Sequence, residues 1–474
     1  MRRKKLFIEN FFVYGMSTVI SKAIPVLMVP IITRLVPDTS IYGVSDLLHV
    51  LVSFASAFAI LGMYDAMFRD FFENETQSHK QIVCSSSLTV VFFASLITSF
   101  FVVLFCRAIS NILFSSEEYF PFVILMGVQV FVSAISSIIA APIRMQNKRR
   151  VFVLLSVVVP LVSYGVSVPL ILWVDPLFGL VMGGFSAVFF KFLFFWILTR
   201  KWFRIKWFSK KRALEMLKIG LPIMPTFLIY WVFASFDRIM ISNMLGTSQN
   251  GIFAVGSKLS QVSQLIYAGF AGGWQFFAFS TMKDRDQVQL TSKVFEYLKV
   301  ISFLATLVLI PWIPTLFRLL FSGDYVLGYQ VAPYLFLSPL LLMLFQTAGN
   351  QLLVVKRSYW ITLSLLAGAG LNVLLNFLLI PLWGIEGAAV STLVGYACSV
   401  IAIAIVTKLK KLLQIKPRFL ASSLVVLGVF FVNRFFQFSF LGLLAFSGVG
   451  VFLILVWYVK DLRGIIQGGN LFRK

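Results

Sequence analysis

The sequence contains few acidic residues, few cysteines and no recognisable nucleotide-binding loop. Its 474 residues include 18 Asp and Glu and 3 Cys, against 41 Lys and Arg. Cys84 and Cys106 fall near opposite ends of one apolar run, about 33 Å apart if that run is helical, which excludes a disulfide between them. Nothing resembles a Walker A loop, which excludes an ATPase within this chain. We expect no cofactor, no metal site and no covalent catalysis.

Long polar stretches are also absent, so no segment is large enough to form a soluble domain. The chain is 59% hydrophobic with a mean hydropathy of +0.93, whereas soluble domains are about 45–50% apolar. Apolar runs long enough to cross about 30 Å of hydrocarbon recur along its whole length. The composition therefore predicts an all-α polytopic membrane protein.

We place about fourteen transmembrane helices along the chain. They cover roughly residues 8–34, 42–69, 83–106, 120–142, 152–174, 177–199, 217–243, 251–279, 294–317, 331–354, 360–381, 386–407, 418–436 and 439–459. The basic start resembles the n-region of a signal peptide, but the following run contains Glu9, Asn10 and Lys22 and lacks an Ala-x-Ala cleavage site. That run is therefore predicted to be a retained first span.

The formal net charge of +23 is unevenly distributed along the chain. With the N-terminus inside, most basic residues fall in segments on the cytoplasmic side, including four in residues 143–151 and eight in residues 200–218. This positive-inside pattern predicts that both termini are cytoplasmic, and it explains the charge without a nucleic-acid partner. The basic residues that lie within predicted spans are Lys22, Lys191, Arg238, Lys258 and Lys299.

The two halves of the chain resemble each other at a constant offset of 208 residues. Tyr42-Gly43 aligns with Asn250-Gly251, and Lys148-Arg149 aligns with Lys356-Arg357. Six spans separate equivalent points, so the repeats are parallel and related by a pseudo-twofold axis along the membrane normal, unless the matches arise by chance. The predicted organisation is an N-terminal lobe (1–199), a basic cytoplasmic linker (200–216), a C-terminal lobe (217–407), and two further helices with a cytoplasmic tail (408–474).

A specific motif covers the end of the predicted span 360–381 and the start of the next. It reads Asn372-Val-Leu-Leu-Asn376-Phe-Leu-Leu-Ile-Pro381-Leu-Trp-Gly384-Ile-Glu-Gly387-Ala-Ala-Val-Ser-Thr392. This resembles the LN..LN..lIP.yGi.GAA..T signature of polysaccharide flippases in the multidrug/oligosaccharidyl-lipid/polysaccharide exporter superfamily. The segments Asp237-Arg238, Leu245-Gly246 and 251–258 are similar to the seventh and eighth spans of that family.

The resemblance implies a Wzx-type flippase of the bacterial plasma membrane, with two six-helix lobes around a central cavity. Its cargo would be an undecaprenyl-pyrophosphate-linked oligosaccharide, such as an O-antigen unit, moved to the outer leaflet by alternating access. Coupling to protons or sodium, contact with membrane lipids and partnership with a polysaccharide polymerase are expected. Related lipid II flippases carry basic residues in spans one, two and eight, and Lys22, Arg69 and Lys258 match these by type and span.

Lys22 and Lys258 are the leading candidates for binding the pyrophosphate. A charge at membrane depth costs about 2.5–3.5 kcal/mol on insertion scales and usually lines a functional cavity. An ammonium in such a cavity attracts an anion strongly. Gln261 follows Lys258 at helical spacing, which favours a polar stripe facing the cavity. The alternative is a buried ion pair that only holds the lobes together.

Carboxylates near the ends of the spans are candidates for gating or ion coupling. Asp65 and Arg69 share one helix face at i and i+4, which predicts a gate latch or an interfacial ion pair. Asp237 and Arg238 form an outer counterpart or a helix-end charge pair, and Arg238 is also a candidate substrate contact.

A relay pair, a weaker carboxylate and several aromatic rings complete the candidate set. Asp46 shares a face with His49 at i and i+3, a spacing compatible with a proton relay, although a single His is more often structural. Glu386 is a weaker coupling candidate. Four aromatic residues lie in spans expected to face the cavity, where their rings stack on sugars or pack in the core: Tyr230, Trp231, Tyr267 and Trp274.

Three alternatives to an oligosaccharide flippase remain open. A lipid II or spore-cortex precursor flippase shares the same class. A drug/cation antiporter is disfavoured because its cavity should be acidic, whereas basic residues lie at depth here. A membrane-embedded polysaccharide polymerase or ligase would need a large outer loop, and the longest ones, residues 107–119 and 318–330, are short.

Overall fold

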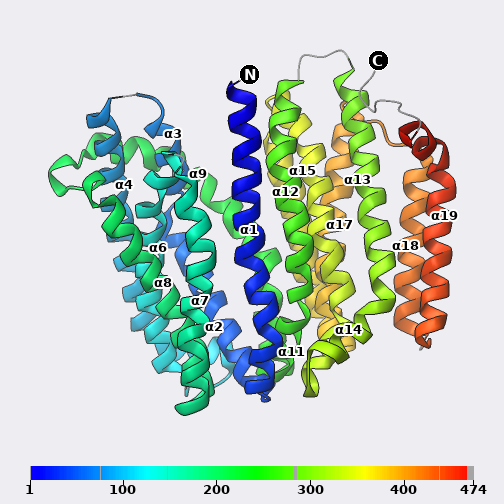
Figure 1. Ribbon diagram of the computed structural model, residues 1–474, viewed down its shortest axis with the longest axis horizontal. Coiled ribbons are helices and arrows are strands. Elements are labelled where there is room, and N and C mark those ends of the chain that lie inside the picture. The colour runs from blue at the N-terminus through cyan, green and yellow to red at the C-terminus, as the bar shows by residue number, and fades with distance from the viewer. Residues whose placement is uncertain (1, 75, 147, 282–285, 437, 467–474) are drawn as a thin grey trace. The chain divides into compact units, whose positions relative to one another are not determined.

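The computed structural model describes residues 2–74, 76–146, 148–281, 286–436 and 438–466 (Figure 1). Within these ranges all regular secondary structure is helical, which confirms the predicted all-α class. In the same ranges, twelve helices are long and apolar enough to cross a membrane. The chain divides into two compact units, Met1–Val255 and Gly256–Lys474.

The first unit is built around α6, whose inner face carries the fully buried Val130 and Ile138. This helix packs against α2, α4 and α8, while α8 also packs against α7, and α7 against α1. The helices of the unit are α1 (Arg2–Leu35), α2 (Thr39–Ile60), α3 (Met63–Phe71), α4 (Gln77–Leu104), α5 (Cys106–Phe114), α6 (Phe120–Met145), α7 (Arg149–Trp173), α8 (Pro176–Thr199), α9 (Lys210–Trp231), a π-helical turn (Val232–Phe236), α10 (Asp237–Leu245) and most of α11 (Thr247–Gly256).

The second unit is organised around α15, which packs against α12, α13 and α17 and is buried along most of its length. Helices α18 and α19 form a pair that contacts α13. The helices are α12 (Lys258–Ser280), α13 (Gln287–Leu309), α14 (Ile313–Leu320), α15 (Ala332–Val354), α16 (Tyr359–Trp383), α17 (Ile385–Leu409), α18 (Pro417–Phe435) and α19 (Phe440–Ile466), with short 3-10 segments at Ile310–Trp312 and Gly323–Gln330.

Two predicted spans are broken in the structure. The span predicted at 42–69 is interrupted at Leu61 and Gly62, which both adopt left-handed backbone angles, with φ of 52° and 66°. Gly62 lies directly against the backbone of Gly220 in α9, so a Cβ atom at this position would overlap it. The span predicted at 251–279 is interrupted at Ser257, so Lys258 begins α12 instead of lying inside a helix.

The internal repeat extends to whole elements. The pair α7–α8 matches α16–α17, with equivalent bounds close to the offset of 208 residues. Gly179 packs against Ile171 in the first hairpin, and Gly387 packs against Leu379 in the second, eight residues earlier in each case. Likewise, α1 matches the segment from α9 to α10, and α6 matches α15. Helices α18 and α19 lie outside this correspondence.

The starts of α2 and α11 cross at two equivalent glycines. A Cβ at Gly43 would meet the backbone of Thr247, and a Cβ at Gly251 would meet the backbone of Thr39. The amide of Asn250 also donates to the carbonyl of Gly43 over 3.0 Å. Since Thr39 and Gly43 correspond to Thr247 and Gly251 at the offset of 208, the contact is reciprocal, as twofold symmetry requires. This geometry supports a duplication with a local pseudo-twofold axis between the two glycines.

The predicted basic linker is an ordered segment held by α4. It forms two 3-10 turns, Arg200–Trp202 and Ile205–Trp207, before α9 begins at Lys210. The backbone N–H of Arg204 donates to Ser85 Oγ over 3.1 Å, and that of Ser209 donates to Ser86 Oγ over 3.0 Å. Because α9 packs on α3 and α4 within the first unit, the lobe boundaries proposed from the sequence stay a prediction.

Candidate functional site

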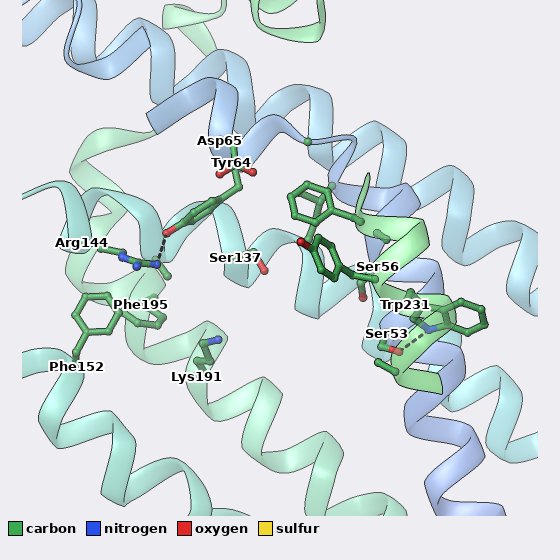
Figure 2. Close-up of a pocket in the computed structure, with 17 residues that line it drawn as sticks. Ser53, Ser56, Tyr64, Asp65, Ser137, Arg144, Phe152, Lys191, Phe195 and Trp231 are labelled. Carbon is green, nitrogen blue, oxygen red and sulfur yellow. Dashed lines mark hydrogen bonds between the residues drawn. The ribbon is translucent and has the colours of Figure 1, made fainter. Parts of the chain in front are cut away.

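A cavity of about 760 Å³ lies within the first unit (Figure 2). Its walls come from α2, α3, α6, α7, α8, α9 and the π-helical turn, so segments far apart in the sequence enclose it. The lining residues are Ser53, Ser56, Ala57, Ile60, Gly62, Tyr64, Asp65, Ser137, Ala140, Arg144, Phe152, Lys191, Phe195, Phe227, Tyr230, Trp231 and Ala234.

Two basic side chains line this cavity. The Nη1 of Arg144, near the end of α6, donates to the hydroxyl of Tyr64 over 3.1 Å. The ammonium of Lys191, on α8, makes no hydrogen bond or ion pair within the described ranges of the chain. Figure 2 shows both residues on the same side of Ser137. A lysine without a counter-ion in a membrane helix is costly, so its presence in a cavity wall points to an anionic ligand.

The single carboxylate that lines the cavity belongs to Asp65, on α3. Partial burial raises the pKa of this carboxyl, and the guanidinium of Arg144 opposes that shift. Two cations therefore face one carboxylate across the lining, which leaves the wall net positive when all three groups are ionised. Such a cavity favours anions over cations.

The break between α2 and α3 places Tyr64 and Asp65 at the cavity. Because the chain turns at Leu61 and Gly62, α3 starts in a new direction immediately after the span Thr39–Ile60. Only glycine fits at Gly62, since its positive φ and its contact with Gly220 both exclude a Cβ. The local sequence thus fixes how two of the lining side chains are presented.

The aromatic wall is held by a chain of hydrogen bonds. The indole N–H of Trp231 donates to Ser53 Oγ over 3.1 Å, and the hydroxyl of Ser53 donates to the carbonyl of Val50 over 2.8 Å. The ring of Trp231 also packs on Phe54, with centroids 4.5 Å apart. Figure 2 shows Trp231 at the end of the cavity away from Arg144 and Lys191.

Lys22 and Lys258 belong to different units of the structure. Lys22 is half-buried on α1, and Lys258 is half-buried at the first position of α12. Gln261 and the buried Trp274 follow on α12. Convergence of these residues on one pyrophosphate site therefore stays a prediction.

Arg69 lies outside the cavity. Its side chain is 68% exposed, and its Nε is 4.0 Å from the carboxylate of Glu73, which lies four residues further on, just past the end of α3. Asp65, its predicted partner, lines the cavity instead. The role of Asp65 and Arg69 as a gate latch stays a prediction.

Asp46 and Arg238 form a buried ion pair between α2 and α10. The Nη1 of Arg238 donates to both carboxylate oxygens of Asp46, over 2.8 and 3.0 Å. Asp237 accepts the backbone N–H of Arg238 over 2.9 Å. His49, predicted as the relay partner of Asp46, has its Nδ1 2.7 Å from the carbonyl of Ser45. Two candidates from separate predictions are thus paired with each other.

Sequence reasoning did not single out the two cavity cations. The positive-inside pattern places Arg144 in a cytoplasmic segment, and Lys191 lies close enough to the inner end of its predicted span to extend toward water at the interface. Lys191 nevertheless lies inside the apolar run 177–199, the same signal that singled out Lys22 and Lys258. The sequence signal was present, but it could not distinguish a cavity from an interface.

Comparison with protein families decides the affiliation of the chain. Residues 31–325 match the model of a family described as "polysaccharide biosynthesis protein". The chain belongs to this family. The match covers more than half of the sequence and confirms the resemblance to polysaccharide flippases. Comparison with curated proteins gave no significant match.

Solved structures show which fold this member of the polysaccharide biosynthesis family adopts. It is similar to the lipid II flippase MurJ in an inward closed conformation, with a TM-score of 0.70 at 15% identity over 96% of this chain and 99% of that one. It is also similar to an inward-facing multidrug resistance MATE transporter of the MOP superfamily, with a TM-score of 0.61 at 12% identity over 83% of this chain and 98% of that one. A third match is a MOP superfamily transporter from Pyrococcus furiosus described with a binding pocket of reverse polarity. Its TM-score is 0.55 at 13% identity over 85% of this chain and 95% of that one.

These likenesses establish the fold of the protein. Together with the twelve apolar helices among the described residues, they show a multi-pass membrane protein with the architecture of MOP superfamily flippases and transporters.

Proposed function

We propose that this protein is a flippase that moves an undecaprenyl-pyrophosphate-linked oligosaccharide from the cytoplasmic to the outer leaflet by alternating access. The observation that carries the proposal is the cavity of the first unit, in which Lys191 has no partner among the described residues and Arg144 lies on the same side. The family match to polysaccharide biosynthesis supports the choice of cargo.

The chemistry of the cargo explains why such a cavity is needed. A diphosphate and a hydrated glycan cannot cross hydrocarbon, because each lost hydrogen bond and each desolvated charge costs several kcal/mol. Lys191 and Arg144 replace part of the hydration of the diphosphate, while serine and tyrosine hydroxyls are available to sugar hydroxyls. The polyprenyl tail stays in the bilayer. No bond is made or broken, so the protein acts as a transporter.

A drug/cation antiporter fits the cavity less well. Its lining has two cations and a single carboxylate, so it repels the cationic drugs that such antiporters bind. A lipid II precursor flippase fits equally well in charge, and the likeness to a lipid II flippase supports this second candidate. The two candidates differ in the glycan, which the accumulated intermediate identifies.

The same proposal includes coupling to an ion gradient and export of an O-antigen unit. It also includes a bacterial plasma-membrane location with cytoplasmic termini, and cooperation with a polymerase. Asp65 is the carboxylate best placed to couple protonation to the cavity, since it lines the wall beside Arg144. Lys22 and Lys258 remain candidates for a further contact with the pyrophosphate.

The test measures which lipid-linked intermediate accumulates in cells. The chromosomal copy is replaced by Lys191→Met or by Arg144→Gln, and polyprenyl-linked lipids are extracted and identified by mass spectrometry. We expect Lys191→Met to raise the intracellular intermediate at least tenfold, because about 1.4 kcal/mol of lost binding already gives a factor of ten. The mass of the intermediate names the cargo.

The matched control is Lys201→Met, which removes an exposed lysine outside the cavity. It should leave the lipid profile unchanged, and all variants should reach the membrane in equal amounts. Normal lipid profiles and normal surface polysaccharide in both cavity variants would contradict the proposed function.

A further inference from the structure

Two hydroxyl groups at the cavity wall make no hydrogen bond to any residue that the structure describes. Ser56 is 9% exposed, and its Oγ makes no hydrogen bond within the described ranges. The phenol of Tyr230 likewise has none among the described residues, and Tyr230 lines the same cavity. An unpaired buried hydroxyl lowers stability and is uncommon in folded proteins, so that of Ser56 calls for an explanation. Tyr230 is half-buried, and its phenol is a second hydroxyl that a ligand in the cavity can reach.

Neighbouring serines show how such hydroxyls are normally satisfied. Ser53 donates to the carbonyl of Val50, and Ser137 donates to the carbonyl of Ser133. Serines in helices commonly make this bond to the preceding turn. Ser56 lines the cavity between these two and makes no such bond. Its hydroxyl is therefore available to a molecule inside the cavity.

The polar groups of the cavity fall into two sets. Figure 2 shows Arg144 and Lys191 on one side of Ser137, and Ser56 on the other, toward Trp231. The first set, on α6 and α8, supplies two cations beside the single carboxylate of Asp65, and the second, on α2 and α9, supplies neutral hydroxyls. A ligand that satisfies both sets has an anionic end and a hydroxyl-rich end.

We propose that Ser56 and Tyr230 form a subsite for the sugar ring next to the diphosphate of the lipid-linked cargo, while Lys191 and Arg144 hold the diphosphate. This proposal rests on the proposed function and adds that the same cavity recognises the first sugar of the glycan. Sugar hydroxyls donate and accept, so one ring satisfies both unpaired protein hydroxyls. Binding of the sugar then supplies the hydrogen bonds that Ser56 and Tyr230 do not make with the described residues of the protein.

The binding test compares two probes on the purified full-length protein. One is a short-chain polyprenyl diphosphate, and the other is the same lipid carrying one hexose. The wild-type protein should bind the glycosylated probe more tightly, and Ser56→Ala and Tyr230→Phe should each reduce that advantage by about threefold to tenfold, the value of one hydrogen bond. Both variants should leave affinity for the unglycosylated probe unchanged.

A second measurement separates a ligand group from a structural one. Ser56→Ala removes an unpaired buried hydroxyl, so it should raise the thermal midpoint of the protein without ligand. The same variant should bind the glycosylated probe more weakly. Ser136→Ala is the matched control, because Ser136 on the neighbouring helix α6 also has an unpaired buried hydroxyl but does not line the cavity. It should raise the thermal midpoint without changing affinity for either probe.

The outcomes distinguish the two proposals. Equal affinity for both probes in the wild-type protein, or an unchanged sugar advantage in Ser56→Ala and Tyr230→Phe, would overturn the sugar subsite while leaving the flippase standing. Binding of neither probe by the wild-type protein would overturn the proposed function together with the subsite. A lower thermal midpoint for Ser56→Ala would show that its hydroxyl is structural.

Discussion

Most buried charged side chains that the structure describes have a hydrogen-bond or ion-pair partner within the protein, and Lys191 differs from them in this respect. Lys299 is fully buried on α13, where its ammonium donates to the carbonyl of Phe419 and to the hydroxyl of Ser422. Glu386 accepts from the hydroxyl of Tyr334 over 2.7 Å and pairs with Arg434 at 3.0 Å. These contacts give both residues partners within the protein, and the coupling role of Glu386 stays a prediction. Lys191 has no such contact in the described ranges, so a ligand is the simplest partner for it.

The ion pair between Asp46 and Arg238 should be strongly coupled. Removing one partner leaves a buried charge unpaired, so Asp46→Asn or Arg238→Met should each lower the free energy of unfolding by about 3–5 kcal/mol. The double variant should cost less than the sum of the two, since neither member of the pair is left buried without the other. Thermal unfolding in detergent of the wild-type protein, the two single variants and the double variant measures this double-mutant cycle. Additive losses would show that the two side chains do not stabilise each other.

The sequence indicates which charges lie at depth, but it cannot indicate their partners. Helical spacing reports neighbours on one helix, and it therefore linked Asp46 to His49 and Asp65 to Arg69. The partner of Asp46 is Arg238, on a helix 192 residues away in the chain. Long-range pairs of this kind depend on how apolar helices cross, and apolar runs of similar composition give no signal for their neighbours.

At the scale of elements, glycines determine where helices approach most closely. Gly43 and Gly251 bring α2 and α11 into backbone contact, and Gly62 and Gly220 do the same for the start of α3 and for α9. The sequence predicted the first pair as equivalent positions of a repeat. It did not predict that the two positions touch, because equivalence says nothing about distance to the symmetry axis.

Alanine at either of the crossing glycines should be poorly tolerated. Because an added Cβ at Gly43 or Gly251 overlaps backbone atoms, each helix must move, and we expect a loss of about 1–3 kcal/mol or more in unfolding free energy. Reciprocity predicts similar losses for Gly43→Ala and Gly251→Ala. Thermal midpoints in detergent provide the measurement.

Gly165→Ala is the control for that comparison. Gly165 lies within α7, and a Cβ there meets nothing within 4 Å. Its substitution should leave stability unchanged or raise it by about 0.5–1 kcal/mol, since alanine favours the helix. A crossing-glycine variant as stable as the control would contradict the close approach of α2 and α11.

At the scale of the whole molecule, the repeat and the all-helical class were accessible from the sequence, while the cavity was not. Periodic apolar runs and the offset of 208 residues are properties of the chain itself. The cavity is a property of packing, assembled from six helices and a π-helical turn, and its formation depends on the break at Gly62. Helix breaks of this kind inside a continuous apolar run carry no composition signal beyond a single glycine.

The helices outside the repeat are held to the second unit at both ends of α18. Near its start, Arg418 pairs with Glu296 of α13 and, at 2.6 Å, with Asp461 of α19. Near its end, Arg434 pairs with Glu386 of α17. Three arginine–carboxylate contacts thus connect α18 to the repeated helices and to α19.

The central claim is that the cavity cations carry a lipid-linked glycan across a membrane. Its most direct test reconstitutes the purified protein into vesicles that contain a polyprenyl diphosphate oligosaccharide in both leaflets. A membrane-impermeant glycosidase then trims every glycan that reaches the outer surface. The account predicts that wild-type protein exposes the whole pool, whereas Lys191→Met exposes only the outer-leaflet fraction seen in protein-free vesicles. Equal, complete trimming with Lys191→Met, or no trimming beyond the protein-free level with wild-type protein, would contradict the account.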